Sequence, residues 1–556
     1  MEALDWLVIG VFFLALIGII VWVVRQKQND SADYFLGGRD ATWLAIGASI
    51  FASNIGSEHL IGLAGAGASS GMAMAHWEIQ GWMILILGWV FVPFYSRSMV
   101  YTMPEFLERR YNPQSRTILS VISLVSYVLT KVAVTVYAGG LVFQQVFGIK
   151  ELWGIDFFWI AAIGLVVLTA LYTIFGGMKS VLYTSVLQTP ILLLGSLIIL
   201  VLGFKELGGW DEMMRVCGAV TVNDYGDTMT NLIRSNDDAN FPWLGALIGS
   251  AIIGFWYWCT DQFIVQRVLS GKNEKEARRG TIFGAYLKLL PVFLFLIPGM
   301  IAFALHQKYI GAGGEGFLPM LANGTANADA AFPTLVAKLL PAGVKGLVVC
   351  GILAALMSSL ASLFNSSAML FTIDFYKRFR PETPEKKLVG IGQIATVVIV
   401  ILGILWIPIM RSVGDVLYTY LQDVQSVLAP GIAAAFLLGI CWKRTSAQGG
   451  MWGLIAGMVI GLTRLGAKVY YSNAGEVADS TFKYLFYDMN WLFFCGWMFL
   501  FCIIVVIVVS LATEAPTAEK IQGLVFGTAT KEQKAATRAS WDHWDIIHTA
   551  IILSLI

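Results

Sequence analysis

Long apolar stretches recur along the whole chain and alternate with short polar segments. A helix needs about 20 apolar residues to cross a bilayer, and stretches of this length are frequent here. We predict fourteen membrane-spanning helices, at residues 4–24, 43–71, 76–97, 117–147, 154–176, 180–203, 243–269, 280–306, 345–375, 388–410, 416–442, 449–470, 488–512 and 544–556. The last stretch has only about a dozen apolar residues, so it is either incomplete or does not cross fully.

The basic residues of the short loops predict the orientation. If every stretch spans, they gather on one side: Arg25 and Lys27; Arg109, Arg110 and Arg116; Lys272, Lys275, Arg278 and Arg279; Lys377, Arg378 and Arg380; Lys443 and Arg444. The positive-inside rule makes that side cytoplasmic and places the N-terminus outside. We therefore expect a multi-pass protein of the plasma membrane. The short N-terminus and lean loops favour a bacterial inner membrane.

Two predicted spans contain polar, glycine-bearing interruptions. Residues 48–62 read ASIFASNIGSEHLIG, and residues 254–262 read GFWYWCTDQ. Backbone that leaves the helix at membrane depth is tolerated only where it lines a cavity or is buried in protein. A pair of interrupted spans in corresponding halves points to a transporter binding site. The spacing predicts a single transport domain with two five-helix inverted repeats, at 43–203 and 243–442, flanked by 1–42 and 443–556.

Composition narrows the class of protein further. Of the 556 residues, 57% are hydrophobic and 13% charged, about half the charge of a soluble domain. The net charge of +1 gives no reason to expect a nucleic-acid partner. The six cysteines follow no metal-ligand or disulfide pattern, and no triad, metal cluster or phosphate loop indicates an enzyme. The oligomeric state stays open.

Ionisable residues inside spans are costly and therefore candidates for function. Glu78 opens the third span and Lys288 lies inside the eighth. Carboxylate, amide, imidazole and ammonium groups suit an uncharged ligand rich in hydroxyls, while aromatic side chains cover its C–H face. The interruption in the seventh span supplies aromatic side chains in Tyr257 and Trp258. Three other charges, Lys131, Asp261 and Arg464, are interpreted as pairing between helices.

The ninth span carries a row of small residues on one helix face. Ala355, Ser358, Ser359 and Ser362 are spaced i, i+3, i+4 and i+7. A sodium ion needs several oxygen ligands, and carbonyls freed at an unwound helix together with hydroxyls of a facing helix supply them. Serine in a membrane helix also bonds back to its own backbone, which is the simpler explanation of this row.

Six long stretches of the chain are distinctive: DYFLGGRDATWLAIGASIFASNIGSEHLIGLAGAG, YTMPEFLERRY, FWYWCTDQFIVQRVLSGKN, YLKLLPVFLFLIPGMIA, LMSSLASLFNSSAMLFTIDFY and LAPGIAAAFLLGICWKR. They resemble the solute:sodium symporters, and within them the sodium/glucose and sodium/myo-inositol cotransporters. The resemblance covers nearly the whole chain. It implies a LeuT-type architecture and alternating access around a site at the membrane midplane.

The resemblance also implies roles for individual residues. The sugar site of the family corresponds here to Asn54, His59, Glu78, Tyr257, Trp258, Lys288 and Gln422. Tyr257 resembles the inner gate, and the outer gate corresponds to Leu63, Trp77 and Tyr418. The principal sodium site corresponds to the carbonyls of Ala52, Ile55 and Ala355 and the hydroxyls of Ser358 and Ser359.

The chain departs from the family pattern at informative positions. Gly254 stands where relatives have a polar residue one turn before the tyrosine, so one contact to a solute hydroxyl is expected to be missing or mediated by water. Glu58 before His59 leaves the choice between hexose and inositol open. Ser185 replaces the aspartate of the two-sodium members, and Ala361 replaces one hydroxyl of the facing helix. Both changes favour one sodium per solute.

Transport of a monosaccharide is accordingly the function we expect. One sodium supplies roughly 3.7 kcal/mol at 100 mV and a tenfold gradient, enough for accumulation of several hundredfold. Inositol, sialic acid or an amino acid are the alternative solutes. A sodium-dependent sensor without net transport is the alternative from another class, although no signalling domain is evident. A channel is disfavoured because no ring of filter residues is apparent.

Overall fold

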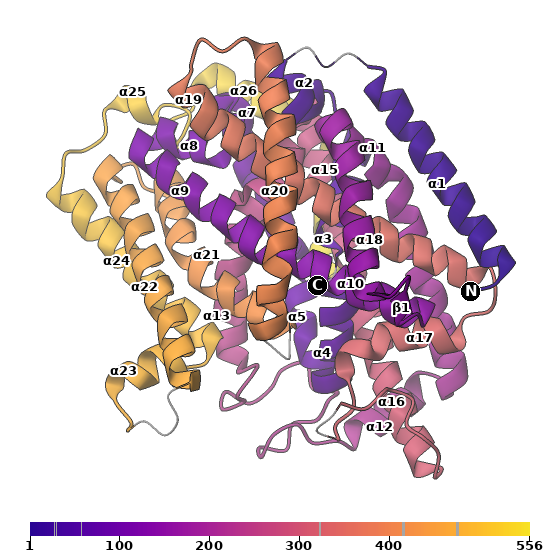
Figure 1. The fold of residues 1–556 in the computed structure, drawn as a ribbon. Helices are drawn as coiled ribbons and strands as arrows, with labels where there is room; N and C mark the ends of the chain where they lie inside the picture. Colours follow the sequence, from indigo (N-terminus) through magenta and orange to yellow (C-terminus); the bar gives the residue numbers. More distant parts are fainter. Residues whose placement is uncertain (27, 29, 57, 322–323, 414–416, 474–477) are drawn as a thin grey trace.

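The structure is a computed structural model that describes residues 1–556 except 27, 29, 57, 322–323, 414–416 and 474–477; the side chains of 129–130, 409–413, 417–423 and 473 also lie outside the described part. The described chain is helical almost throughout, as the sequence predicts (Figure 1). A short antiparallel hairpin of β1 (Glu151–Leu152) and β2 (Ile155–Asp156) joins α10 (Ala133–Phe147) to α11 (Phe157–Leu207).

Ten helical segments of the described residues are long and apolar enough to cross a membrane: Ala3–Val24, Glu58–Ser98, Phe157–Leu207, Trp243–Thr260, Glu274–Gly311, Val344–Phe379, Glu385–Pro408, Val424–Cys441, Ala447–Ser472 and Trp491–Ala512. One of them contains two predicted spans. Gly177 in α11 has φ 54° and ψ −149°, a conformation that suits only glycine, and it separates the spans expected at 154–176 and 180–203. The protein is thus multi-pass, while the number fourteen stays a prediction.

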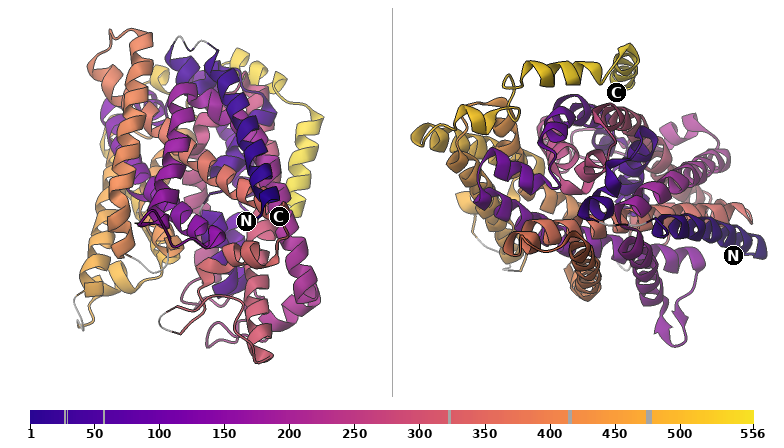
Figure 2. Two further views of the ribbon diagram at one scale, coloured as in Figure 1. Left: turned by 45° about the vertical axis from the view of Figure 1, so that its right-hand side comes forward. Right: turned by 90° about the horizontal axis from the view of Figure 1, so that it is seen from above.

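The last helix, α27 (His543–Leu555), is only 13 residues long. Its C-terminal end lies about halfway between the two faces of the molecule (Figure 2, left). At 1.5 Å per residue it covers about 20 Å, less than the roughly 30 Å hydrocarbon core of a bilayer. The described part of this helix is therefore shorter than a full span, and both alternatives for the last stretch stay open.

The polar ends of the molecule are built from short helices. At one face lie α2 (Ser31–Leu36), α8 (Met103–Arg110), α19 (Lys377–Phe379) and α26 (Lys531–Ala539); at the other lie α12 (Trp210–Gly218), α17 (Ala331–Leu339) and α23 (Thr481–Lys483) (Figure 1). The first face carries basic loop residues such as Arg109 and Arg378. This is the segregation of charge on which the predicted orientation rests.

Outer helices present apolar side chains to the surroundings. α1 (Ala3–Val24) and α24 (Trp491–Ala512) lie on opposite flanks (Figure 1), and their side chains Leu14 and Val508 are exposed. Exposed leucine and valine over a whole helix face are typical of contact with lipid. Beside α24 lie α21 (Leu417–Cys441) and α22 (Ala447–Asn473), which pack against each other and against it.

The interior is formed by helices far apart in sequence. α3 (Trp43–Asn54) packs against α11, α15 (Glu274–Lys288) and α18 (Val344–Met369). The remaining long elements are α9 (Pro113–Ser126), α13 (Trp243–Gly254), α14 (Gln262–Leu269), α16 (Ile297–Gly311) and α20 (Glu385–Val413). Because α3 is enclosed by neighbours, its end lies deep inside the protein, where the candidate site begins.

Candidate functional site

The first break separates α3 from α4 (Ala64–Ser70). α3 ends at Asn54 because Ile55 has an extended backbone, with φ −79° and ψ 103°, and a π-helical segment resumes at Glu58–Leu63. A helix end leaves its last carbonyls without partners in the helix. Asn54 and His59, on the two sides of this break, are 6% and 4% exposed, so both predicted solute ligands are buried at its edges.

The second break separates α13 from α14. The π-helical turn Phe255–Thr260 ends at Asp261, whose backbone is extended (φ −75°, ψ 127°) and whose carboxylate caps α14 by accepting from the backbone N–H of Phe263. Tyr257 and Trp258 lie in this turn and pack edge to face, with ring centroids 4.9 Å apart. The interruption predicted from the polar residues of this span is therefore present, and it presents two aromatic rings to the interior.

A buried ionic network joins both breaks. The ammonium of Lys288, at the end of α15, lies 2.6 Å from Oε2 of Glu78, which ends α5 (Ala75–Glu78). The same oxygen lies 3.2 Å from Nε2 of His59. Asn54 completes the chain of contacts: its Oδ1 accepts from Lys288 at 3.2 Å, and its Nδ2 donates to the hydroxyl of Tyr257 at 3.0 Å. Five residues predicted from sequence to bind solute thus form one connected cluster.

These side chains enclose a small cavity. It is lined by Asn54, Glu58, His59, Trp77, Glu78, Gln80, Ile253, Gly254, Tyr257, Trp258, Lys288 and Gln425, and its volume is about 30 Å³. One water needs about 10–15 Å³ on this scale, so the space suits a few waters rather than a monosaccharide. Binding a sugar-sized solute therefore requires the lining side chains to separate.

The predicted outer gate is placed only in part. Trp77 lines the cavity and packs against Trp491, with ring centroids 5.8 Å apart. Leu63 is buried in the π-helical segment but is not among the lining residues. Tyr418 and the predicted solute ligand Gln422 belong to α21, and their side chains lie outside the described residues. The gating roles stay predictions.

The predicted sodium ligands come from the end of α3 and from α18. Ala52, Ile55, Ala355 and Ser358 are at most 1% exposed, and Ser359 is 5% exposed. The hydroxyl of Ser359 donates to the carbonyl of Ser53 at 2.7 Å, so α18 already touches the carbonyls at the break. Carbonyl and hydroxyl oxygens are the ligands that hard cations prefer. The residue types and their placement fit a sodium ion.

Next to these residues lies a cluster of serines. The hydroxyl of Ser185 lies 3.4 Å from that of Ser358 and 3.5 Å from that of Ser49, and it donates to the carbonyl of Val181 at 2.6 Å. A serine has no negative charge to hold a second cation. The structure thus places a neutral hydroxyl at the position where two-sodium relatives are expected to have a carboxylate.

The charges interpreted as interhelical pairs are paired. Lys131 lies 2.8 Å from Oδ2 of Asp261, whose other oxygen accepts from the hydroxyl of Tyr127. Arg464 donates to the carbonyl of Met489 at 2.8 Å. The predicted pairing is confirmed for Lys131 and Asp261, and Arg464 binds backbone carbonyls of the segment that follows α22. Lys131 also lies 4.7 Å from the ring centroid of Tyr257, so this pair packs against the residue predicted to be the inner gate.

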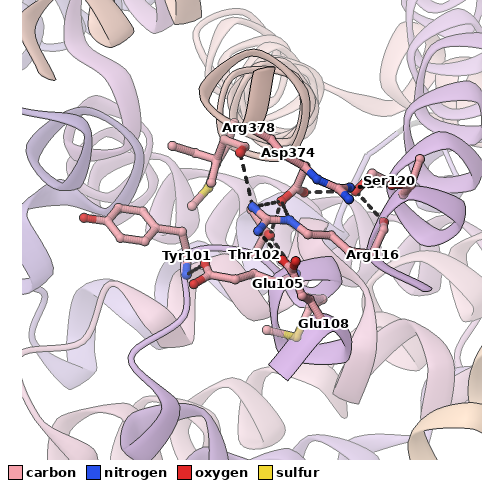
Figure 3. Close-up of polar contacts among 12 residues, drawn as sticks. Tyr101, Thr102, Glu105, Glu108, Arg116, Ser120, Asp374 and Arg378 are labelled. Carbon is pink, nitrogen blue, oxygen red and sulfur yellow. Dashed lines mark hydrogen bonds and ion pairs between the residues drawn. The ribbon is translucent and has the colours of Figure 1, made fainter. Parts of the chain in front are cut away.

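A second polar cluster, which was not predicted from the sequence, surrounds Asp374 (Figure 3). Asp374, in the π-helical segment Leu370–Tyr376 that continues α18, accepts from Nε of Arg116 at 2.7 Å and from the hydroxyls of Thr102 and Ser120. Arg116 also binds Glu108 at 2.6 Å. This cluster ties the end of the helix that carries Ser358 and Ser359 to α8 and α9. An aspartate at the end of an apolar span was the available signal.

Gln80, which was also not predicted, lines the cavity two residues after Glu78. Its amide nitrogen donates to the carbonyl of Ser250 at 3.0 Å, and its Oε1 accepts from Nε1 of Trp258 at 3.2 Å. Nothing in the sequence distinguishes this glutamine from others in the chain. Its significance depends on what lies opposite it in three dimensions.

Comparison with known proteins gives the family. Residues 34–457 match the model of the sodium:solute symporter family. The chain is 37% identical over 542 residues to the sodium/myo-inositol cotransporter 2 of Mus musculus, covering 95% of this chain and 80% of that protein. It is 35% identical over 560 residues to the sodium/glucose cotransporter 4 of Danio rerio, covering 97% and 84%.

Solved structures agree on the fold. A substrate-bound, outward-open Na⁺-coupled sialic acid symporter superposes with a TM-score of 0.74 at 22% identity, covering 93% of this chain and 99% of that one. The expected fold class, an all-α membrane protein of LeuT-type architecture, is confirmed. This likeness concerns the fold and leaves the solute to be argued from the site.

Proposed function

The chain belongs to the sodium:solute symporter family and is a sodium-coupled solute symporter, and we propose that its solute is an uncharged polyol or monosaccharide. The observation that carries the proposal is the buried Glu78–Lys288 pair between two broken helices, 2.6 Å apart and linked to His59 and Asn54. Relatives named as myo-inositol and glucose cotransporters support the same class of solute.

The charge balance of the site favours an uncharged solute. Glu78 and Lys288 neutralise each other, so a neutral ligand leaves no buried charge without a partner. A solute carboxylate would compete with Glu78 for the ammonium. A hydroxyl group both donates and accepts a hydrogen bond. It can therefore bind the carboxylate, ammonium and amide groups that line the cavity. The rings of Tyr257 and Trp258 offer an apolar face for the C–H side of a ring-shaped solute.

Coupling follows from two adjacent residues. Ser53 offers its carbonyl to Ser359 on the sodium side, while the next residue, Asn54, contacts Lys288 and Tyr257 on the solute side. A cation held by the end of α3 and by α18 fixes the backbone at Ser53. Fixing this backbone places the Asn54 amide for the solute, so each ligand lowers the cost of ordering the site for the other.

Alternating access requires the cluster to open on one side at a time. The Asn54–Tyr257 hydrogen bond closes the cavity from the side of the second break, and we assign Tyr257 the inner gate and Trp77, Leu63 and Tyr418 the outer gate. We propose that residues 43–203 and 243–442 form the two inverted repeats. The N-terminus then lies on the outer side of a plasma membrane, and the short loops favour a bacterial membrane. Motion of one repeat against the other exposes a fixed site in turn to each face.

We further propose one sodium per solute, because Ser185 supplies a neutral hydroxyl beside Ser358. Reversal potentials measured in voltage-clamped membranes test this stoichiometry. A shift that corresponds to one charge per solute agrees with it, and a shift for two charges contradicts it.

Competition for uptake tests the class of solute. Labelled myo-inositol or glucose is offered in a sodium gradient, together with excess unlabelled polyols, monosaccharides, sialic acid or amino acids. We expect neutral polyhydroxylated compounds to displace the label and charged compounds to leave it unaffected. Displacement by sialic acid or by an amino acid alone contradicts the proposal, while sodium-dependent binding without uptake indicates a sensor.

A further inference from the structure

The most informative departure from the family pattern is Gly254, the last residue of α13. A Cβ atom built on this glycine lies 2.8 Å from Oε1, 3.0 Å from Cδ and 3.2 Å from Nε2 of Gln80. Real Cβ atoms essentially never make contacts shorter than 3.0 Å. The amide of Gln80 therefore fills the volume that a side chain at position 254 would need, and it would have to move to admit one.

The Gln80 amide is held firmly from two directions. It bridges Ser250, one turn before Gly254, and the indole of Trp258, one turn after it. The side chain is 4% exposed, so its remaining bonding capacity faces the interior rather than bulk water. Both anchors lie on the second broken helix, while Gln80 itself follows Glu78 on another element.

The amide keeps capacity to bind a ligand. A primary amide has two N–H donors and two oxygen lone pairs, and the contacts to Ser250 and Trp258 use one of each. One N–H and one lone pair remain at the wall of the cavity that Asn54, Glu78 and Lys288 also line. A donor and an acceptor on one planar group match a hydroxyl, or two neighbouring hydroxyls, of a polyol.

We propose that Gln80 is a specificity-determining residue, whose amide stands in the space of a side chain at position 254 and binds a solute hydroxyl there. The expectation of a missing or water-mediated contact at Gly254 is thereby replaced by a direct contact from the turn that follows α5. This inference rests on the proposed function, since it assumes a hydroxylated solute. Gly254 is the complement that makes room for it.

Analogues of the solute that lack single hydroxyls measure this contact. Sodium-driven uptake of myo-inositol or glucose is compared with uptake of each monodeoxy analogue, as ratios of kcat/KM, for the wild type and Gln80→Ala. In the wild type, removing the hydroxyl that faces Gln80 leaves the amide unsatisfied, which is expected to lower kcat/KM about 10- to 100-fold. In Gln80→Ala, kcat/KM for the analogue that lacks this hydroxyl should differ from that for the parent solute by only a few-fold. The ratios for analogues that lack other hydroxyls should stay unchanged.

A reciprocal exchange separates a binding role from a packing role. Gly254→Ser in the wild-type background forces the Gln80 amide out of place and lowers both thermal stability and uptake. In the Gln80→Ala background the same change has room, and it restores selectivity for one hydroxyl. Gln262→Ala is the control for loss of a buried glutamine, because Gln262 bonds the backbone of Tyr101 and Met103 and does not line the cavity.

The outcomes separate the specificity role from the proposed function. A uniform fall in uptake of all analogues in Gln80→Ala, as in the Gln262→Ala control, overturns the specificity role and leaves the proposed function in place. Equal costs of Gly254→Ser in both backgrounds also overturn it. Where Gln80→Ala does not fold, Gln80→Asn, which keeps the amide but shortens its reach, is measured in its place. Wild-type protein that moves no polyol or monosaccharide overturns the proposed function and the inference with it.

Discussion

The Glu78–Lys288 pair allows the most quantitative test of the site. Replacing Glu78 with glutamine keeps the shape of the side chain and removes its charge. Both Lys288 and His59 meet the same oxygen, Oε2, so a single change alters both contacts. At 2.6 Å and an effective dielectric constant of about 20, the attraction between the two charges is about 6 kcal/mol.

The net cost is smaller, since a buried pair is also expensive to desolvate. Breaking such a pair on one side costs about 3–5 kcal/mol, because the remaining charge has no counter-charge. After Glu78→Gln, the ammonium of Lys288 keeps Oδ1 of Asn54 at 3.2 Å and the face of Trp258 at 5.4 Å. We expect Glu78→Gln and Lys288→Met each to lower the apparent melting temperature clearly, and the double variant Glu78→Gln/Lys288→Met to recover most of the loss.

Solute affinity is expected to behave differently from stability. Hydrogen bonds to charged groups contribute about 1.5–3 kcal/mol each, so all three variants should bind the solute at least about tenfold more weakly. The assay pairs thermal unfolding of purified protein in detergent with sodium-dependent solute binding. Glu212→Gln, at the exposed pair of Glu212 with Arg215, serves as the control and should change neither quantity.

Two results would refute this reasoning. A double variant as unstable as the worse single variant would mean that the pair is not the source of the loss. A double variant that recovers solute affinity along with stability would mean that the two charges hold the fold and do not contact the solute.

Further predictions concern regions around the site. Asp374→Ala should destabilise the protein by about 3 kcal/mol, because Arg116 then keeps only the carboxylate of Glu108. Thermal unfolding measures this loss, with the double variant Arg116→Ala/Asp374→Ala as the control. Gly299→Ala should strongly reduce the yield of folded protein, because the new Cβ overlaps the carbonyl of Ala64. Gly164→Ala is the control: no atom lies within 4 Å of the new Cβ, so the melting temperature should stay the same or rise slightly. Burial raises the pKa of Asp329, in the loop before α17, to about 6. Between about pH 4 and 6 the native state therefore binds more protons than the unfolded state. The free energy of unfolding consequently falls as pH rises through this window. Asp329→Asn should abolish that fall, and an unchanged slope of melting temperature against pH would contradict it.

Much of the site could be predicted because its residues are unusual for their surroundings. Charges inside apolar spans are rare, so Glu78 and Lys288 stand out in the amino-acid sequence itself, whereas Asn54 is assigned through the resemblance to the family. Their convergence depends on two broken helices that are also visible in the sequence, through glycine and polar residues at membrane depth. The row of Ala355, Ser358 and Ser359 on one helix face is also visible in the sequence, and its role in binding sodium stays a prediction.

Other features depend on contacts that no local pattern encodes. The significance of Gln80 arises from the absent side chain of Gly254 on a different helix, and a glycine in a membrane helix ordinarily indicates close packing. The Asp374 cluster joins Asp374 to Arg116, which lies 258 residues away in the chain. The number of fourteen spans stays a prediction, although the turn at Gly177 divides α11 between the two spans that the hydropathy pattern places there.

Sodium-coupled transport of a neutral solute is tested most directly by uptake into proteoliposomes. Labelled myo-inositol and labelled glucose are offered with an inward sodium gradient, and separately with an equal potassium gradient, to the wild type and to Ser359→Ala. We predict sodium-dependent accumulation of at least one of the two solutes by the wild type, and loss of this sodium dependence in Ser359→Ala. Accumulation that is equal in potassium, or that keeps its full sodium dependence in Ser359→Ala, would contradict the proposed coupling between α3 and α18.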